Sequence, residues 1–151
     1  MLVLTGTTER TAADPCFVSG SSDRLPVVSF DVFFQGFIAG ESSARGCSRM
    51  RDVLLPHAIE TKGSFLRLRV GDGEADIHLS DDGMIANHVT GRDSWDLLVR
   101  GAQAANWVIL PAGGPTCLTQ PGQRDELPDE LADDVTFVET GADLRTLIEA
   151  R

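Results

Sequence analysis

The chain has 151 residues, 42% of them hydrophobic and 24% charged, which fits one globular domain spanning residues 1–151. Its 23 acidic residues outnumber 13 basic ones, and the net charge of −10 argues against nucleic acid as a partner because phosphate would be repelled. Residues 1–7 lack the pattern of a secretory signal, and no apolar run approaches the roughly 18 residues of a membrane span, so we expect a cytoplasmic protein that does not bind membranes.

Strands are predicted in the first quarter of the chain. Two short ones, at residues 2–4 and 16–18, precede the most apolar segment. Over residues 27–38 apolar and polar side chains alternate, with Phe34 on the apolar side and Gln35 on the polar side. Alternation with period two is typical of a half-buried strand, so this segment is predicted to be a long strand of the sheet.

A short helix and a meander are predicted next. Ser48 can cap a helix over residues 48–55. Residues 65–89 then alternate so regularly that they predict a three-stranded antiparallel meander, with turns at Gly71–Glu74 and at Asp81–Gly83.

The register of the first hairpin follows from its cross-strand partners. With Gly71–Glu74 as the turn, apolar pairs fall on one face and charged pairs on the other. The predicted pairs are Val70 with Ala75, Arg69 with Asp76, Leu68 with Ile77, and Arg67 with His78. The same alternation sends His78 to the charged face and His88 to the apolar face, so these two imidazoles are not expected to share a metal.

Helices and strands are expected to alternate in the last third of the chain. Asp93 can cap a helix over residues 93–105, and a Thr140/Asp143 capping box begins a helix over residues 141–150. Strands are predicted at 107–110 and 135–138, residues 111–123 are predicted as loop, and 124–134 as an acidic short helix or pair of turns. The predicted fold class is therefore α+β, with a mainly antiparallel sheet packed by helices.

The sequence gives little support for a metal site or an active site. Asp72, Glu74 and Asp76 lie in and beside a predicted hairpin turn, without the ligand spacing of a calcium loop. The three cysteines have no CxxC spacing and are expected to be small buried or half-buried residues. We therefore expect no cofactor, no bound metal and no enzymatic activity.

The hypothesis that the sequence favours is a protein that binds a basic partner. Residues 124–134 contain six acids and one base. The predicted contact residues are Asp125, Glu126, Asp129 and Glu130, with Asp81 and Asp82 as a second group. In size, acidity and lack of a catalytic motif the chain is similar to bacterial immunity proteins, which occlude the active site of a toxin.

Two alternatives remain open. One is a small enzyme or ligand-binding domain with a site on the charged face of the meander, formed by Arg67, Arg69, Asp76 and His78. The other is an accessory subunit of a larger assembly, which would expose an apolar patch around Phe33 and Phe37.

Overall fold

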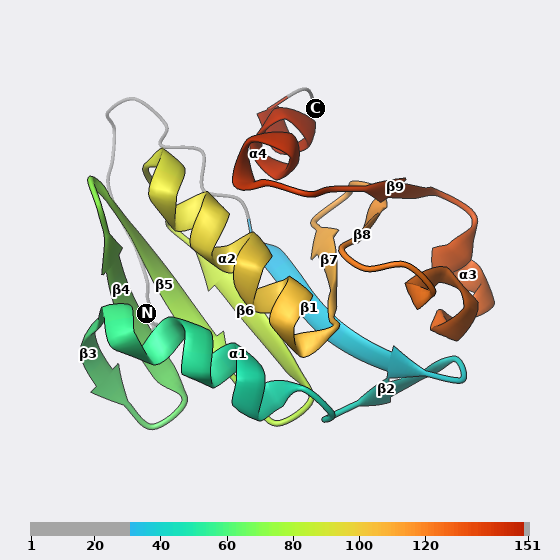
Figure 1. Ribbon diagram of the computed structural model, residues 1–151, viewed down its shortest axis with the longest axis horizontal. Helices are drawn as coiled ribbons and strands as arrows, with labels where there is room; N and C mark the ends of the chain where they lie inside the picture. Colours follow the sequence, from blue (N-terminus) through green and yellow to red (C-terminus); the bar gives the residue numbers. More distant parts are fainter. Residues whose placement is uncertain (1–30, 150–151) are drawn as a thin grey trace, which may run out of the picture.

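The computed structural model describes residues 31–149, which form an open nine-stranded sheet with its longer helices packed on one face (Figure 1). The strands are β1 (Val32–Ile38), β2 (Glu41–Ser43), β3 (Ala58–Lys62), β4 (Phe65–Val70), β5 (Gly73–Leu79), β6 (Gly83–Asn87), β7 (Val108–Pro111), β8 (Thr116–Leu118) and β9 (Val135–Phe137). The helical segments are α1 (Cys47–Leu54), η2 (Leu55–His57), α2 (Arg92–Ala105), η3 (Gln123–Glu126), α3 (Asp129–Ala132) and α4 (Gly141–Glu149).

The strands run in the order β3-β4-β5-β6-β1-β7-β8-β9, with β2 paired to the far half of β1. Every pair is antiparallel except β8 with β9. The predicted α+β class with a mainly antiparallel sheet is therefore confirmed. The strands predicted at 2–4 and 16–18, like residues 27–30 of the long strand, lie outside the described residues.

The central strand β1 behaves as its sequence pattern predicts. Val32 and Phe34 are fully buried beneath the helices, whereas Phe33 between them is 40% exposed on the other face. Phe34 lies between Met84 of β6 and Ile109 of β7, so the core extends across the middle of the sheet. Helices α1, α2 and α4 cover this core, and α2 contacts both of the others.

The helix starts were predicted with mixed success. The capping box of α4 is confirmed, since Thr140 Oγ1 accepts from the Asp143 N–H at 3.1 Å and Asp143 Oδ2 accepts from the Thr140 N–H at 3.3 Å. Capping by Ser48 and Asp93 is wrong, because Gly46 and Gly91 occupy those N-cap positions. At Gly46 a Cβ would lie 2.1 Å from the Ala105 carbonyl oxygen, so close contact with the end of α2 requires glycine.

The predicted register of the first hairpin is wrong by two residues. Arg67 faces Asp76, Arg69 faces Glu74, and Phe65 faces His78. The strands continue to Val70 and Gly73, so the turn contains two residues rather than four, and Gly71 in it has a φ of +57°. A shift of two residues keeps each side chain on its predicted face, and alternation alone could not detect it.

Three short strands were missed. β3 pairs with β4 and extends the predicted three-stranded meander to four strands. β2 returns against β1, and β8 lies within the segment predicted as loop. Each is short or rich in polar residues, and its strand conformation depends on a neighbour supplied by the fold rather than on its own pattern.

Trp107 joins three parts of the fold. Its side chain is fully buried, and its indole Nε1 donates to the Arg45 carbonyl oxygen at 2.8 Å. A Cβ added to Gly36 would lie 2.6 Å from this Nε1, so the indole passes directly over the backbone of β1. Nε1 and the glycine together fix the end of α2 against β1 and the β2–α1 connection.

None of the helices in residues 31–149 combines the length and the apolarity needed to cross a bilayer.

Replacing Gly36 by Ala is expected to lower the free energy of unfolding by about 1–3 kcal/mol, because the methyl group overlaps the indole and the Ser43 carbonyl oxygen. Gly63→Ala is the matched control. A Cβ at Gly63 meets nothing within 4 Å, and the positive φ of this residue gives an expected loss of about 1 kcal/mol in the free energy of unfolding. Urea unfolding of both variants checks the order; a Gly36→Ala protein as stable as the natural one would contradict the close packing.

Candidate functional site

The face of the sheet opposite the helices carries a row of partly exposed, mostly apolar side chains. The strand registers align Phe65, His78, Ile85, Phe33 and Leu110 across five strands. Ile85 is 39% exposed, similar to Phe33. His78 packs against the Phe65 ring at 5.2 Å between centroids. Exposure of Phe33 agrees with the patch predicted there, whereas Phe37 is only half-exposed.

A charged network lies beside this row. Arg67 Nε donates to Asp76 Oδ1 at 3.1 Å, and its Nη1 lies 3.7 Å from Glu60 Oε1. The hydrogen bond and charge of Asp76 raise the pKa of Arg67 above its ordinary value. Arg69 pairs in the same way with Glu74 at 2.9 Å. An anionic ligand of the predicted Arg67/Arg69/Asp76/His78 site would meet guanidinium groups that are already paired with carboxylates.

The placement of His88 differs from its prediction. Strand β6 ends at Asn87, and His88 adopts a φ of +52°, which breaks the alternation of the strand. Its Nδ1 lies 3.0 Å from Asp76 Oδ2, so the ring is on the charged face instead of the apolar one. Within residues 31–149 no group of three or more His, Cys, Asp and Glu side chains is arranged to hold a metal ion.

The two described cysteines are packed as predicted. Cys117 is fully buried in the core beneath the helices, and burial raises the pKa of its thiol to about 12. Such a thiol is protonated at pH 7 and is a poor nucleophile. Cys47 is half-buried and its Sγ donates to the Ser80 carbonyl oxygen at 3.4 Å.

Burial of Cys117 predicts a loss of stability at alkaline pH. Because the folded pKa lies above that of the unfolded thiol, unfolding releases a proton once the pH exceeds the unfolded value. The contribution of the protonated Cys117 thiol to the free energy of unfolding is complete below about pH 8.5 and declines as pH rises toward 12. Urea unfolding from pH 8 to 11 should show a smaller decline for Cys117→Ala than for the natural chain, and equal declines would contradict the assignment.

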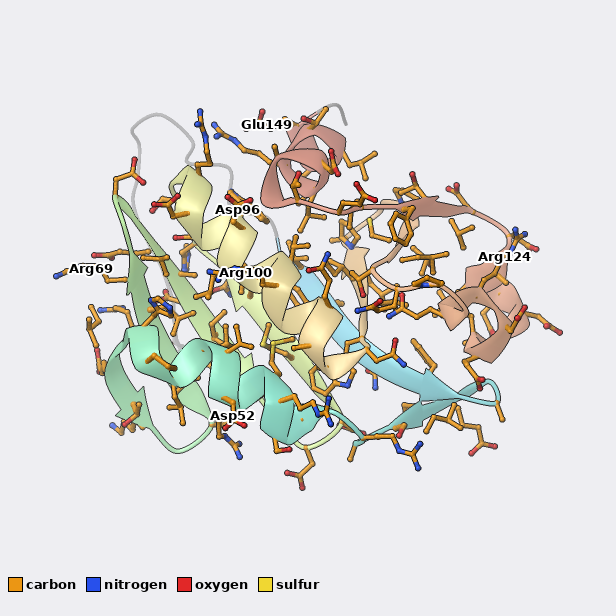
Figure 2. The ribbon with its side chains drawn as sticks, in the orientation of Figure 1. Asp52, Arg69, Asp96, Arg100, Arg124 and Glu149 are labelled. Atoms are coloured by element: carbon orange, nitrogen blue, oxygen red, sulfur yellow. The ribbon has the colours of Figure 1, made fainter. Side chains whose placement is uncertain are left out.

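The strongest charge asymmetry lies at residues 124–143, here called the acidic end. Eight of its residues are acidic and Arg124 is its one base. It comprises the last part of η3, then α3, β9 and the first turn of α4. Figure 2 shows Arg124 at the opposite end of the molecule from Arg69, so the paired charges of the meander are remote from it.

A buried glutamine fixes the segment that carries these acids. Gln123 Oε1 accepts from the backbone N–H groups of Thr119 and Gln120 at 2.7 and 3.1 Å. Its Nε2 donates to Asn106 Oδ1 and to Thr119 Oγ1, both at 3.0 Å. All four hydrogen-bonding positions of the amide are therefore used, and η3 is held firmly against the end of α2.

The four predicted contact acids of the acidic end have two different roles. Glu126 Oε1 accepts from the Ala39 N–H at 2.7 Å, and the Glu126 carbonyl oxygen accepts from the Gly40 N–H at 2.8 Å. Glu126 therefore holds the β1–β2 turn in place. Asp125, Asp129 and Glu130 are exposed and available to a partner.

The second predicted acidic group lies in the β5–β6 turn. Asp81 and Asp82 are both exposed, and the Asp82 carbonyl oxygen accepts a hydrogen bond from Gln35 Nε2. Gln35, which contacts the Asp82 carbonyl oxygen, lies in β1, whereas Ala39, which contacts Glu126, lies in the β1–β2 turn. The two acidic groups thus contact the β1–β2 hairpin at different points.

Strand β9 was predicted, but its functional features were missed. It is the last strand in the sheet order, and Phe137 on it is 47% exposed. A hollow of about 370 Å³ lies beside it, lined by Phe137, Glu139, Asp143 and Leu147 among others. The exposure of Phe137 could not be read from the sequence, because its position at the sheet edge depends on the missed strand β8.

Comparison of the chain with models of protein families, with curated proteins and with solved structures finds no match.

Proposed function

We propose that this protein binds a basic partner protein and neutralises it by covering a functional surface, as an immunity protein does for a toxin. The observation that carries the proposal is the acidic end, where eight acids and one base are gathered in 20 consecutive residues. In the rest of the sequence acids and bases are nearly balanced, so most of the excess negative charge is concentrated in the acidic end. A basic protein would be drawn toward this end and oriented by it.

The acidic end also combines charge with an apolar anchor. Phe137 is nearly half exposed among the acids, and protein interfaces commonly place an aromatic side chain at the centre of a charged rim. The exposed carboxylates of Asp125, Asp129 and Glu130 would pair with Lys or Arg of the partner. In this arrangement the charges accelerate encounter and select the partner, while burial of Phe137 slows dissociation.

The proposal predicts that the triple variant Asp125→Asn, Asp129→Asn, Glu130→Gln associates with the partner roughly tenfold more slowly at low ionic strength. The partner is the protein captured from the native host by the natural chain, and its association rate is measured from 20 to 500 mM salt. The variant should also show a weaker dependence on salt. Glu126 is left unchanged because it holds the β1–β2 turn.

The matched control is Asp52→Asn, Asp72→Asn, Asp93→Asn, which removes the same charge from exposed positions outside the acidic end. This control should associate at nearly the natural rate. If both triple variants slow association equally, net charge rather than the acidic end governs binding, and the proposed surface is wrong.

A further inference from the structure

The outer edge of β9 has backbone groups without a strand beside them in the described part of the chain. On the inner edge, the Thr116 N–H donates to the Asp134 carbonyl oxygen and the Val138 N–H to the Leu118 carbonyl oxygen, each at 2.9 Å. Backbone groups of alternate residues point to opposite edges of a strand. The N–H and C=O groups of Val135 and Phe137 therefore point away from β8.

This open edge has a defined length. The Glu139 N–H, which follows in the same direction, already donates to Asp143 Oδ2 at 3.0 Å within the cap of α4. Two residues thus remain, with two donors and two acceptors for an added strand. Other proteins add an extended peptide to such an edge by main-chain hydrogen bonds and select it through alternate side chains.

The edge combines an apolar side chain with acidic ones. Val138 is buried in the core with Leu144, so Phe137 projects from the opposite face of the sheet. The hollow of about 370 Å³ beside the edge is lined by Phe137 as well as by Glu139, Asp143 and Leu147. A strand laid against β9 would therefore meet Phe137 with apolar side chains and these carboxylates with basic ones.

We propose that β9 takes an extended, basic segment of the partner as an additional strand, with apolar residues toward Phe137 and Lys or Arg toward Glu139 and Asp143. This inference rests on the proposed function and names the contact through which it acts. The acids Asp133, Asp134 and Glu139 flank the edge. They attract a basic segment, and they repel the β9 edge of a second copy, because pairing would bring like charges together.

The opposite sheet edge lacks this selectivity. β3 has an irregularity in its pairing between Ala58 and Glu60, and its exposed face carries both Glu60 and Lys62. A bulge and mixed charge are common means of protecting a sheet edge from added strands. Of these two edges, the acidic one at β9 is the one that fits a basic strand.

The test uses a seven-residue peptide in which Arg and Val alternate, titrated into the full ¹⁵N-labelled chain and followed by NMR. Two matched peptides carry N-methyl groups on the Val residues or on the Arg residues. They keep the charge and side chains, but each blocks the N–H groups of one peptide edge. Strand addition uses one edge, so one methylated peptide should bind about tenfold more weakly and the other as well as the parent. The resonances that shift should be centred on Val135 and Phe137.

A protein variant tests the same contact from the other side. Val135→Pro removes an outward N–H and spares the bonds to β8, and it should bind the parent peptide about fivefold more weakly than Val135→Ala. Spectra of both free variants verify that they are folded. Equal binding of all three peptides, binding unaffected by proline, or no binding of the parent peptide overturns strand addition.

These outcomes are distinct from failure of the proposed function. The three peptides could bind equally well and yet bind more weakly to the variant Asp125→Asn, Asp129→Asn, Glu130→Gln. That result would support the acidic end as a binding surface and reject strand addition. If the natural chain did not associate with the captured partner in a salt-dependent way, the acidic end itself would be rejected as the binding surface. A concentration-dependent dimer whose β9 amides are protected in the absence of peptide would assign the edge to a second copy and overturn the inference.

Discussion

The buried indole of Trp107 is the contact on which the arrangement of this protein depends. The indole Nε1 of Trp107 donates to the β2–α1 connection, and the backbone N–H of Trp107 donates to the Ala102 carbonyl oxygen at the end of α2. The Trp107 carbonyl oxygen accepts from Thr119 Oγ1 at 2.7 Å. Gly36 leaves the space that the ring fills. The segment that begins at Thr119 leads into η3 and α3, so the fully buried Trp107 helps to position the acidic end.

Much of the fold was predictable where one face of a segment is buried and the other is not. The alternation in β1, β4, β5 and β6 identified these strands, and the Thr140 box located the start of α4. The same alternation could not fix the first hairpin, because a slip of two residues preserves the face of every side chain. In the observed register Gly73 lies so close to Thr90 that a Cβ would be 1.9 Å from the Thr90 carbonyl oxygen, a contact between segments remote in sequence.

The candidate site was harder to predict because it depends on long-range pairing. Acidic composition identified residues 124–134, but the role of Glu126 as the partner of Ala39 required the β1–β2 turn to be brought against η3. Exposure of Phe137 required β8, a strand of three residues between prolines and polar residues, to separate β9 from the centre of the sheet. Sequence patterns report which residues are buried within an element, and they do not report which element lies at an edge.

The position of β1 between β6 and β7 has a consequence for how the chain folds. The pairs of β4 with β5 and of β5 with β6 join residues close in sequence, whereas Phe33 pairs with Leu110, across most of the described chain. Because closing a long loop costs more entropy than closing a short one, the hairpins of the meander can form first, with β1 and β7 joining later. During synthesis on a ribosome, the edge of β1 that pairs with β7 would therefore stay unpaired until β7 emerges, and an unpaired strand edge can associate with other chains.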